Sequence, residues 1–203
     1  MSALTTESLK PALRRLAAKL EASAEELNAA DAKLGDGDLG VTLQRGARGL
    51  LEALDELPDD VGLAFLQCAQ AFTKISGSSY GTLLATGLMS AAKTCKGRES
   101  VPWSETSALL GGALEAMMAR GKGALGEKTV LDALEAARRA TEGLDEPEAL
   151  RDAAEQAVTE TLETFRDRPA KQGRARMFGE KSVGLDDPGM LAFQRIVEGL
   201  GET

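Results

Sequence analysis

The sequence predicts an all-α protein, and three observations lead to this prediction. Apolar residues recur every three or four positions along most of the 203 residues, which is the period of helices that bury one face. No segment shows the strict alternation of apolar and polar residues that is typical of a half-buried strand. Hydrophobic residues make up 43% of the chain but aromatic residues only 3%, so leucine and alanine are expected to fill the core.

The first expected helix is long and bent. Leucines line one stripe of it from Leu9 to Leu20, at the spacing that places side chains on a single helix face. A capping-box pattern over residues 23–26 predicts that the helix bends or restarts there. The apolar stripe then resumes and continues to Leu34.

The remaining helices follow from apolar spacing and from breaks at proline and glycine. We expect them at about residues 40–57, 61–74, 80–94, 104–120, 130–141 and 147–166. Asp187 and Pro188 fit the N-cap and first residue of a last helix. If the first helix counts as one bent element, there are about eight helices, and since no linker divides the chain, residues 1–203 are expected to form a single domain.

Several residues on apolar stripes are expected to face the core. They include Leu51 and three methionines that are expected to pack in the core rather than act as ligands: Met89, Met117 and Met118. Cys68 and Cys95 have no metal-binding spacing and fit small buried residues of a reduced compartment.

Composition excludes several classes of function. The net charge of −8 argues against nucleic acid or an anionic membrane as a partner, because both need clustered lysine and arginine. The chain has no histidine, which excludes a phosphohistidine carrier, a Ser-His-Asp triad and a histidine-ligated zinc site. Neither a signal peptide nor an apolar run long enough to span a membrane is evident, so a cytoplasmic location is expected.

The most informative segment runs from Asp31 to Gly40, where Asp31, Asp36 and Asp38 fall within eight residues among glycines. Crowded carboxylates repel one another unless a cation lies among them, and oxygen ligands of this kind suit Mg²⁺ or Ca²⁺. Helix capping by Asp36 or Asp38 explains the same residue types without a metal. Asp31, however, shares the apolar stripe of Leu34, so a buried carboxylate that a cation would neutralise is expected there.

Other junctions have residues suited to bind anions. Residues 77–79 precede an apolar helix, whose free N–H groups favour a phosphate, although a serine cap is the simpler explanation. The polar segment 167–186 is long for a connection, and its glycines and basic residues favour a loop that orders over an anionic ligand. Within it, Arg174 suits a phosphate or plain solvent exposure, and Lys122 and Lys128 have the same two explanations. Asp132, near a helix start, is more simply an acid favoured by the helix dipole.

The chain resembles the L subunit of bacterial dihydroxyacetone kinases, the DhaL or DAK2-domain family. Members carry Leu-Asp-x-x-x-Gly-Asp-x-Asp-His-Gly, then Gly-Gly-x-Ser-Gly, Arg-Gly-Lys, Gly-Asp-Lys-Thr, Gly-Arg-Ala, Gly-Glu-Arg-Ser and Asp-Pro-Gly. In this chain the corresponding segments, in the same order, are Ala30–Gly40, Ser76–Ser79, Arg120–Lys122, Gly126–Thr129, Gly173–Ala175, Gly179–Ser182 and Asp187–Gly189. The segments extend over most of the sequence, which makes the resemblance specific.

The resemblance implies an antiparallel barrel of about eight helices with ATP or ADP bound at one rim. Asp31, Asp36 and Asp38 would hold two Mg²⁺ ions, which makes these three the expected catalytic and metal-binding residues. The implied nucleotide contacts are Leu39, Gly40, Val41, Thr42, Ser78, Ser79, Gly121, Val130, Arg174, Asp187, Pro188 and Gly189. The activity implied is phosphoryl transfer to a small keto-sugar, such as dihydroxyacetone, held on a separate K-type subunit, with ATP or a phosphocarrier protein as the phosphoryl source.

Three departures from the family pattern stand near the expected site. Leu39 replaces a histidine, Tyr80 replaces a glycine and is expected to narrow the pocket, and Glu127 replaces an aspartate. Two alternatives stay open at this stage: a module that holds ADP for regulation or docking, and an all-helical two-metal hydrolase. The oligomeric state, for which a homodimer is one candidate, is open as well.

Overall fold

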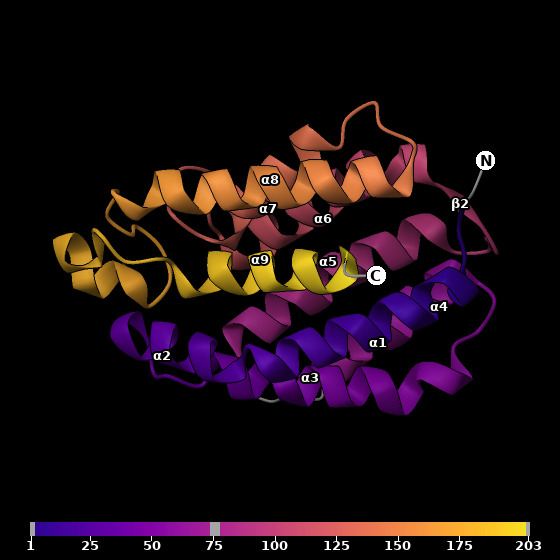
Figure 1. The fold of residues 1–203 in the computed structure, drawn as a ribbon, viewed down its shortest axis with the longest axis horizontal. Coiled ribbons are helices and arrows are strands. Elements are labelled where there is room, and N and C mark those ends of the chain that lie inside the picture. Colours follow the sequence, from indigo (N-terminus) through magenta and orange to yellow (C-terminus); the bar gives the residue numbers. More distant parts are fainter. Residues whose placement is uncertain (1–2, 74–77, 202–203) are drawn as a thin grey trace.

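The computed structural model describes residues 3–73 and 78–201, and almost all of this part is helical (Figure 1). Its α-helices are α1 (Thr6–Ala22), α2 (Ala24–Leu34), α3 (Leu39–Ala53), α4 (Val61–Thr73), α5 (Ser79–Cys95), α6 (Thr106–Gly121), α7 (Val130–Ala140), α8 (Pro147–Arg166) and α9 (Pro188–Gly201). Short 3-10 helices are η1 (Leu54–Glu56), η2 (Trp103–Glu105) and η3 (Ala175–Ser182). The all-α prediction is confirmed, while Gly77 and the other residues of 74–77 lie outside the described part.

The helices form a closed antiparallel ring. Each helix from α3 to α9 packs on the next in sequence, and α1 packs on both α3 and α9, which closes the barrel. Helix α2 extends α1 after a break at Ser23 and packs on α3 and α9. Ser23 makes no side-chain cap hydrogen bond, so the bend is confirmed but the capping box predicted for it is wrong.

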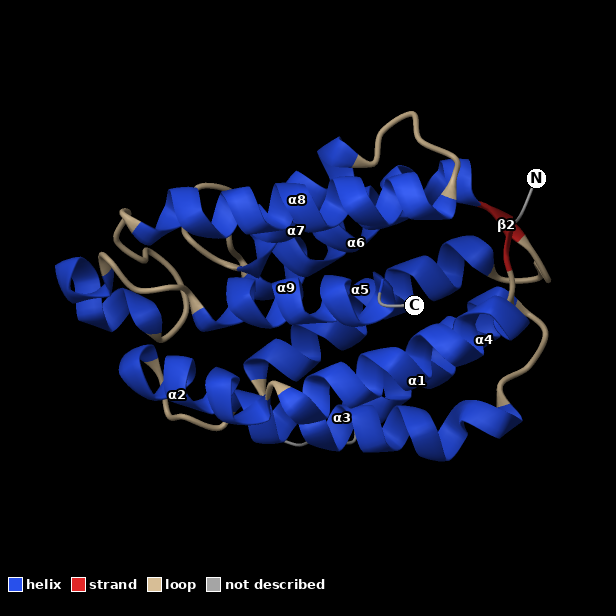
Figure 2. Ribbon diagram, viewed as in Figure 1, coloured by secondary structure: helices blue, strands red, loops and turns tan. Residues whose placement is uncertain are grey.

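One end of the barrel carries a pair of short strands that was not predicted from the sequence. The strand β1 (Ala3–Leu4) pairs antiparallel with β2 (Val101–Pro102), and both lie at the end opposite to α2 (Figure 2). Two residues per strand are too few for an alternating pattern to be recognised in a sequence.

Leucine and alanine dominate the core, as the scarcity of aromatic residues predicts. The main buried cluster draws on every α-helix, with Leu20, Leu27 and Leu43 fully buried. Met117 is buried and Met118 packs against the core, but Leu51 and Met89 are 45% and 51% exposed, so those two assignments are wrong. Both lie beside the stripe that faces inward, where an apolar residue costs little.

The two cysteines are free and buried, as predicted. Burial raises the pKa of Cys68 to about 12 and also raises that of Cys95, so both thiols stay protonated and unreactive. They therefore serve the packing of α4 and α5.

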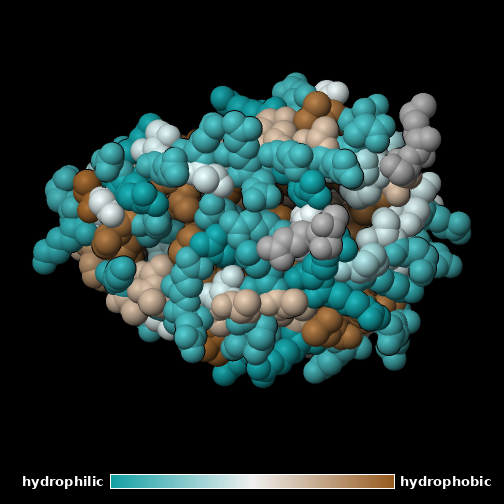
Figure 3. Space-filling model, viewed as in Figure 1, coloured by the Kyte–Doolittle hydropathy of each residue, from teal (hydrophilic) through white to brown (hydrophobic). Residues whose placement is uncertain are grey.

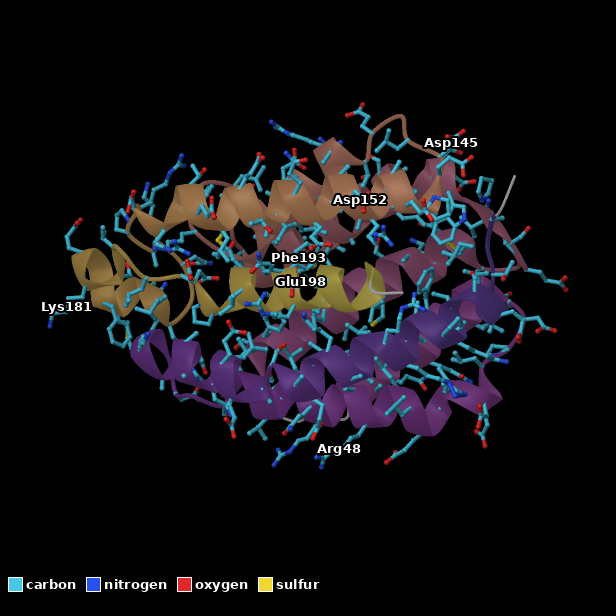
Figure 4. The ribbon with its side chains drawn as sticks, viewed as in Figure 1. Arg48, Asp145, Asp152, Lys181, Phe193 and Glu198 are labelled. Carbon is cyan, nitrogen blue, oxygen red and sulfur yellow. The ribbon has the colours of Figure 1, made fainter. Side chains whose placement is uncertain are left out.

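The segment between α8 and α9 is more ordered than predicted. A loop that orders over an anionic ligand was predicted here. The structure contains the 3-10 helix η3, which folds against the end of α2 through a small apolar cluster of Leu34, Ala170 and Ala175. Lys181, in contrast, points into solvent at the far end of the molecule (Figure 4).

The surface is mostly hydrophilic on the face shown in Figure 3. Hydrophobic residues are scattered among hydrophilic ones there. Within residues 3–73 and 78–201, no helix has the length and apolar character needed to cross a bilayer.

Candidate metal and anion site

The acidic loop folds back over the end of α2. One oxygen of Asp31, Oδ2, accepts hydrogen bonds from the backbone N–H groups of Gly37 and Asp38, at 2.9 and 3.0 Å. Gly37 has a φ of +78°, which favours glycine in this tight turn, and a side chain at Gly35 would meet Asp31 Oδ1 at 2.3 Å and displace that carboxylate. Asp31 is half-buried and has two N–H partners, so the expectation of a buried, unpaired carboxylate is wrong.

The three carboxylates nevertheless converge. Asp31, Asp36 and Asp38 each offer an oxygen within 4.8 Å of the other two. Asp38 occupies the N-cap position of α3 but makes no side-chain cap hydrogen bond. The Asp38 carboxylate is therefore not used to cap α3. Three hard oxygen donors this close together fit a divalent cation such as Mg²⁺.

A different residue caps α3. Asn28 Oδ1 accepts from the backbone N–H groups of Gly40 and Val41 at 2.8 and 3.2 Å. A methyl group at Gly40 would lie 2.0 Å from the carbonyl oxygen of Ala24, so glycine is needed there for α3 to approach α2. These N–H groups are therefore engaged within the fold, and Gly40 and Val41 do not line the pocket described below.

Arg174 forms an ion pair with Asp36 across the mouth of the acidic cluster. The guanidinium holds the pKa of Asp36 below its usual value, chiefly through a side-chain hydrogen bond. The same bond raises the pKa of Arg174, and the charges of Asp38 and Asp31 raise it further. Both side chains are about half exposed, at 55% for Arg174 and 48% for Asp36.

Four helices begin around the same space, namely α3, α5, α7 and α9, and residues from the start of each line it. Their first turns are capped inside the chain. Ser78 Oγ accepts from Gly81 N at 3.0 Å, Thr129 Oγ1 from Leu131 N at 3.2 Å, and Asp187 Oδ1 from Met190 N at 2.9 Å. The cap interpretation of Ser78 is confirmed, and the positive ends of four helix dipoles still converge on one pocket.

That pocket has a volume of about 790 Å³. Of the residues that the sequence analysis placed at the site, it brings these to the lining: Asp31, Asp36, Asp38, Leu39, Thr42, Ser78, Ser79, Gly121, Val130, Arg174, Asp187, Pro188 and Gly189. Residues far apart in sequence thus meet at one rim, and the acidic loop faces the helix starts. A pocket of this size can enclose a ligand as large as a nucleotide.

Other lining residues were not predicted as site residues. The polar ones include Arg45, Thr82, Arg120, Thr129 and Gln172, and the apolar ones include Leu83, Met117 and Leu131. Arg45 stands three positions after Thr42 on the same helix face, a spacing that could have indicated it. Gln172 shows no such pattern, because it reaches the pocket only through the fold of the segment after α8.

Two side chains at the start of α9 and α5 are shielded from solvent: Asp187 is buried, and Tyr80 is partly buried with an enclosed hydroxyl. Burial raises the pKa of Asp187 to about 7. Burial also raises the pKa of Tyr80, whose hydroxyl has no hydrogen-bond partner within residues 3–73 and 78–201. A methyl group at Gly189 would lie 3.3 Å from Tyr80 Cε2, so the tyrosine ring packs against the Asp187–Gly189 turn. Tyr80 also lines the pocket that it was expected to narrow.

Lys128 fits neither explanation given for it. It is 1% exposed, and its Nζ donates to the carbonyl oxygens of Arg166, Arg168 and Ser182 at 3.2, 2.8 and 2.9 Å. The lysine thus ties the loop before α7 to the end of α8 and to η3. Asp132 closes a capping box with Thr129, which confirms that its role belongs to a helix start.

Comparison with known proteins gives several relatives. Human triokinase/FMN cyclase is 33% identical over 203 residues, covering 94% of this chain and 34% of that protein. L-erythrulose 1-kinase of Mycolicibacterium smegmatis is 31% identical, covering 87% of this chain and 32% of that protein. The PEP-dependent dihydroxyacetone kinase, ADP-binding subunit DhaL, of Escherichia coli is 30% identical, covering 81% of each chain. The chain thus spans about a third of the first two relatives.

Solved structures show the same fold. The dihydroxyacetone kinase of C. freundii in complex with AMP-PNP and Mg²⁺ superposes with a TM-score of 0.73 at 23% identity, over 99% of this chain and 34% of that one. The native form of that kinase gives a TM-score of 0.72. A family model described as DAK2 domain matches residues 33–202. The chain therefore belongs to the DAK2 domain family, that of the L subunit of dihydroxyacetone kinases.

Proposed function

We propose that the chain is the nucleotide-binding, phosphotransferring component of a dihydroxyacetone-kinase-like system. One observation carries the proposal: three converging carboxylates face four helix starts across a single pocket. Helix starts attract anions, whereas carboxylates repel them, so the two features suit one ligand only when divalent cations bridge a polyphosphate to the acids. Mg²⁺ with ATP or ADP meets that requirement.

Each part of the pocket has a proposed role. Asp31, Asp36 and Asp38 would hold Mg²⁺, with two ions as the proposed number. Bound Mg²⁺ would neutralise phosphate charge and orient the terminal phosphoryl group. The backbone and side chains at Leu39, Thr42, Ser78 and Ser79 would flank the phosphates.

The remaining pocket residues would hold and enclose the nucleoside. Gly121 and Val130 lie among apolar lining residues, which suits a nucleobase. Arg174 and the Asp187–Gly189 turn would close the site and exclude water from the phosphates. Gly40 and Val41 keep a supporting role, since their N–H groups bind Asn28.

The acceptor is proposed to come from a partner. The chain matches only about a third of the two kinases named above but most of an ADP-binding subunit. With no histidine in the sequence, a keto-sugar held covalently through histidine would have to lie on a K-type subunit. Two modes of phosphoryl supply are distinguished: free exchange of ATP, as in an ATP-dependent kinase, and rephosphorylation of bound ADP by a phosphocarrier protein, as in an ADP-holding module. The relatives that are named ADP-binding subunits favour retained ADP.

Isothermal titration with MgADP and MgATP tests the proposal. Wild type is expected to bind, and Asp38→Asn is expected to weaken binding at least about tenfold because a cation ligand is lost. Asp145→Asn is the matched control, since Asp145 is exposed between α7 and α8 (Figure 4), away from the pocket lining. Equal binding by the Asp38 variant and wild type would contradict the proposed metal site, and nucleotide cleavage without a partner would indicate a hydrolase.

A further inference from the structure

The ion pair between Arg174 and Asp36 gives the candidate site a second property. We propose that Arg174 and a divalent cation compete for Asp36, and that Arg174 passes from this carboxylate to the phosphates when a metal–nucleotide complex binds. The inference rests on the proposed function of the pocket and adds a regulation of the same site. Arg174 would weaken the binding of a free divalent cation and would strengthen the binding of a metal–nucleotide complex.

The backbone on both sides of Arg174 is held by hydrogen bonds and packing, so the proposed change involves its side chain. Just before it, the Gln172 amide donates to the carbonyl oxygens of Gly121 and Lys122, both at 3.3 Å. The carbonyl oxygen of Arg174 accepts from Met177 N at 3.1 Å. The next residue, Ala175, is buried in the small cluster with Leu34. The side chain, by contrast, is half exposed at the mouth of the pocket and can reach different partners from one backbone position.

The exposure of the pair makes such an exchange inexpensive. An ion pair between solvent-exposed side chains changes an equilibrium constant only about two- to fivefold. Coordination by three carboxylates can exceed that easily, so Arg174 would modulate cation binding without blocking it. The pair is therefore suited to reversible exchange.

Charge balance gives the direction of the exchange. Three acidic side chains face one guanidinium at the mouth of the pocket. A divalent cation among the acids would satisfy them and repel the guanidinium, and the strongest remaining anion would be a bound polyphosphate. Guanidinium groups bind phosphate oxygens well, through paired hydrogen bonds.

The test uses Arg174→Gln and measures two affinities. Mn²⁺ binding to the full chain without nucleotide, followed by electron paramagnetic resonance, is expected to tighten about two- to fivefold in the variant. MgADP binding, followed by calorimetry, is expected to weaken about tenfold, because a charged phosphate contact is lost. Arg176→Gln is the control, since Arg176 is exposed on the same segment and outside the pocket lining, and it should change neither affinity.

A double variant separates competition from general charge effects. In an Asp36→Asn background, Arg174→Gln is expected to have no further effect on Mn²⁺ affinity, because the contested carboxylate is gone. Unchanged or weaker Mn²⁺ binding in the single Arg174 variant, with normal MgADP binding by wild type, would overturn the competition and leave the proposed function standing. If wild type bound neither Mn²⁺ nor MgADP, the proposed function itself would fail, and the competition with it.

Discussion

Replacement of Lys128 by methionine is expected to destabilise the fold by an amount that the contacts allow us to work out. Methionine keeps the buried apolar stem and the same positive φ of 62°, so the change removes mainly the ammonium group. Three hydrogen bonds to carbonyl oxygens are lost, each worth roughly 1.5 kcal/mol when the donor is charged. Burial of the ammonium, which lowers its pKa, costs free energy in the wild type and offsets part of the stability that these hydrogen bonds contribute.

The net loss in the free energy of unfolding is therefore expected to be about 3 kcal/mol. For a chain of this size that corresponds to a fall in Tm of about 6–12 °C. Urea unfolding and calorimetry measure both quantities. Hydrogen exchange gives a local measure, because the amides of Ala170 and Lys171, which donate to Ser182 and Glu127, should lose protection first.

Lys122→Met is the matched control for this experiment. Lys122 is also a lysine with a positive φ, of 51°, but it is exposed. Its replacement should change stability by no more than about 0.5 kcal/mol. Equal stability of the Lys128 variant and wild type would refute the reasoning, since it would mean that the cost of burying the ammonium cancels its three hydrogen bonds.

Three further predictions concern residues around the pocket. Gly40→Ala is expected to destabilise the protein by about 1–3 kcal/mol in urea unfolding, because the new methyl group meets the carbonyl oxygen of Ala24, although alanine favours helices. Tyr80→Phe is expected to leave stability unchanged or raise it by about 1 kcal/mol, because the lost hydroxyl is buried and has no partner among the residues that the structure describes. Asp187 has a pKa of about 7 when folded and 3.8 as its reference value, so the folded state binds more protons between these values. The Asp187 carboxyl therefore contributes stability that is lost as the pH rises from 4 to 7, so wild type should lose stability relative to Asp187→Asn over this range.

Each of these three has an outcome that would contradict it. A Gly40→Ala variant with the same free energy of unfolding as wild type would show that α2 and α3 can move apart without loss of stability. A marked loss of stability in the Tyr80 variant would show that the hydroxyl has a partner after all. An identical pH dependence for wild type and the Asp187 variant, measured by urea unfolding at pH 5 and pH 8, would show that this carboxyl ionises normally.

Local features of the fold could be read from the sequence because their causes are local. Apolar spacing placed the helices up to α8, with α1 and α2 as one bent element, and Pro147 and Asp187 marked the starts of α8 and α9, since a cap or a missing N–H acts within one turn. The acidic loop was recognised for the same reason: three carboxylates and their glycines stand within ten residues. Leu51 and Met89 were misplaced because an apolar stripe does not show how far a neighbouring helix extends over it.

The partners of the site residues could not be predicted in this way. Asn28, which caps α3, and Arg174, which pairs with Asp36, are distant from their partners in sequence, by 12 and 138 positions. Lys128 has the same limitation, since its three carbonyl partners belong to the end of α8 and to η3. An isolated lysine in a glycine-rich loop gives no sign of such burial.

The sequence by itself determined the helices and the chemistry of the acidic loop, because both depend on residues within a few turns of one another. Only the tertiary structure decided which helix ends meet. Closure of the ring through α1 and α9 brings four helix starts to one rim, and the small cluster around Leu34 fixes the segment that carries Arg174. These arrangements depend on packing between distant segments, whose geometry no local pattern specifies.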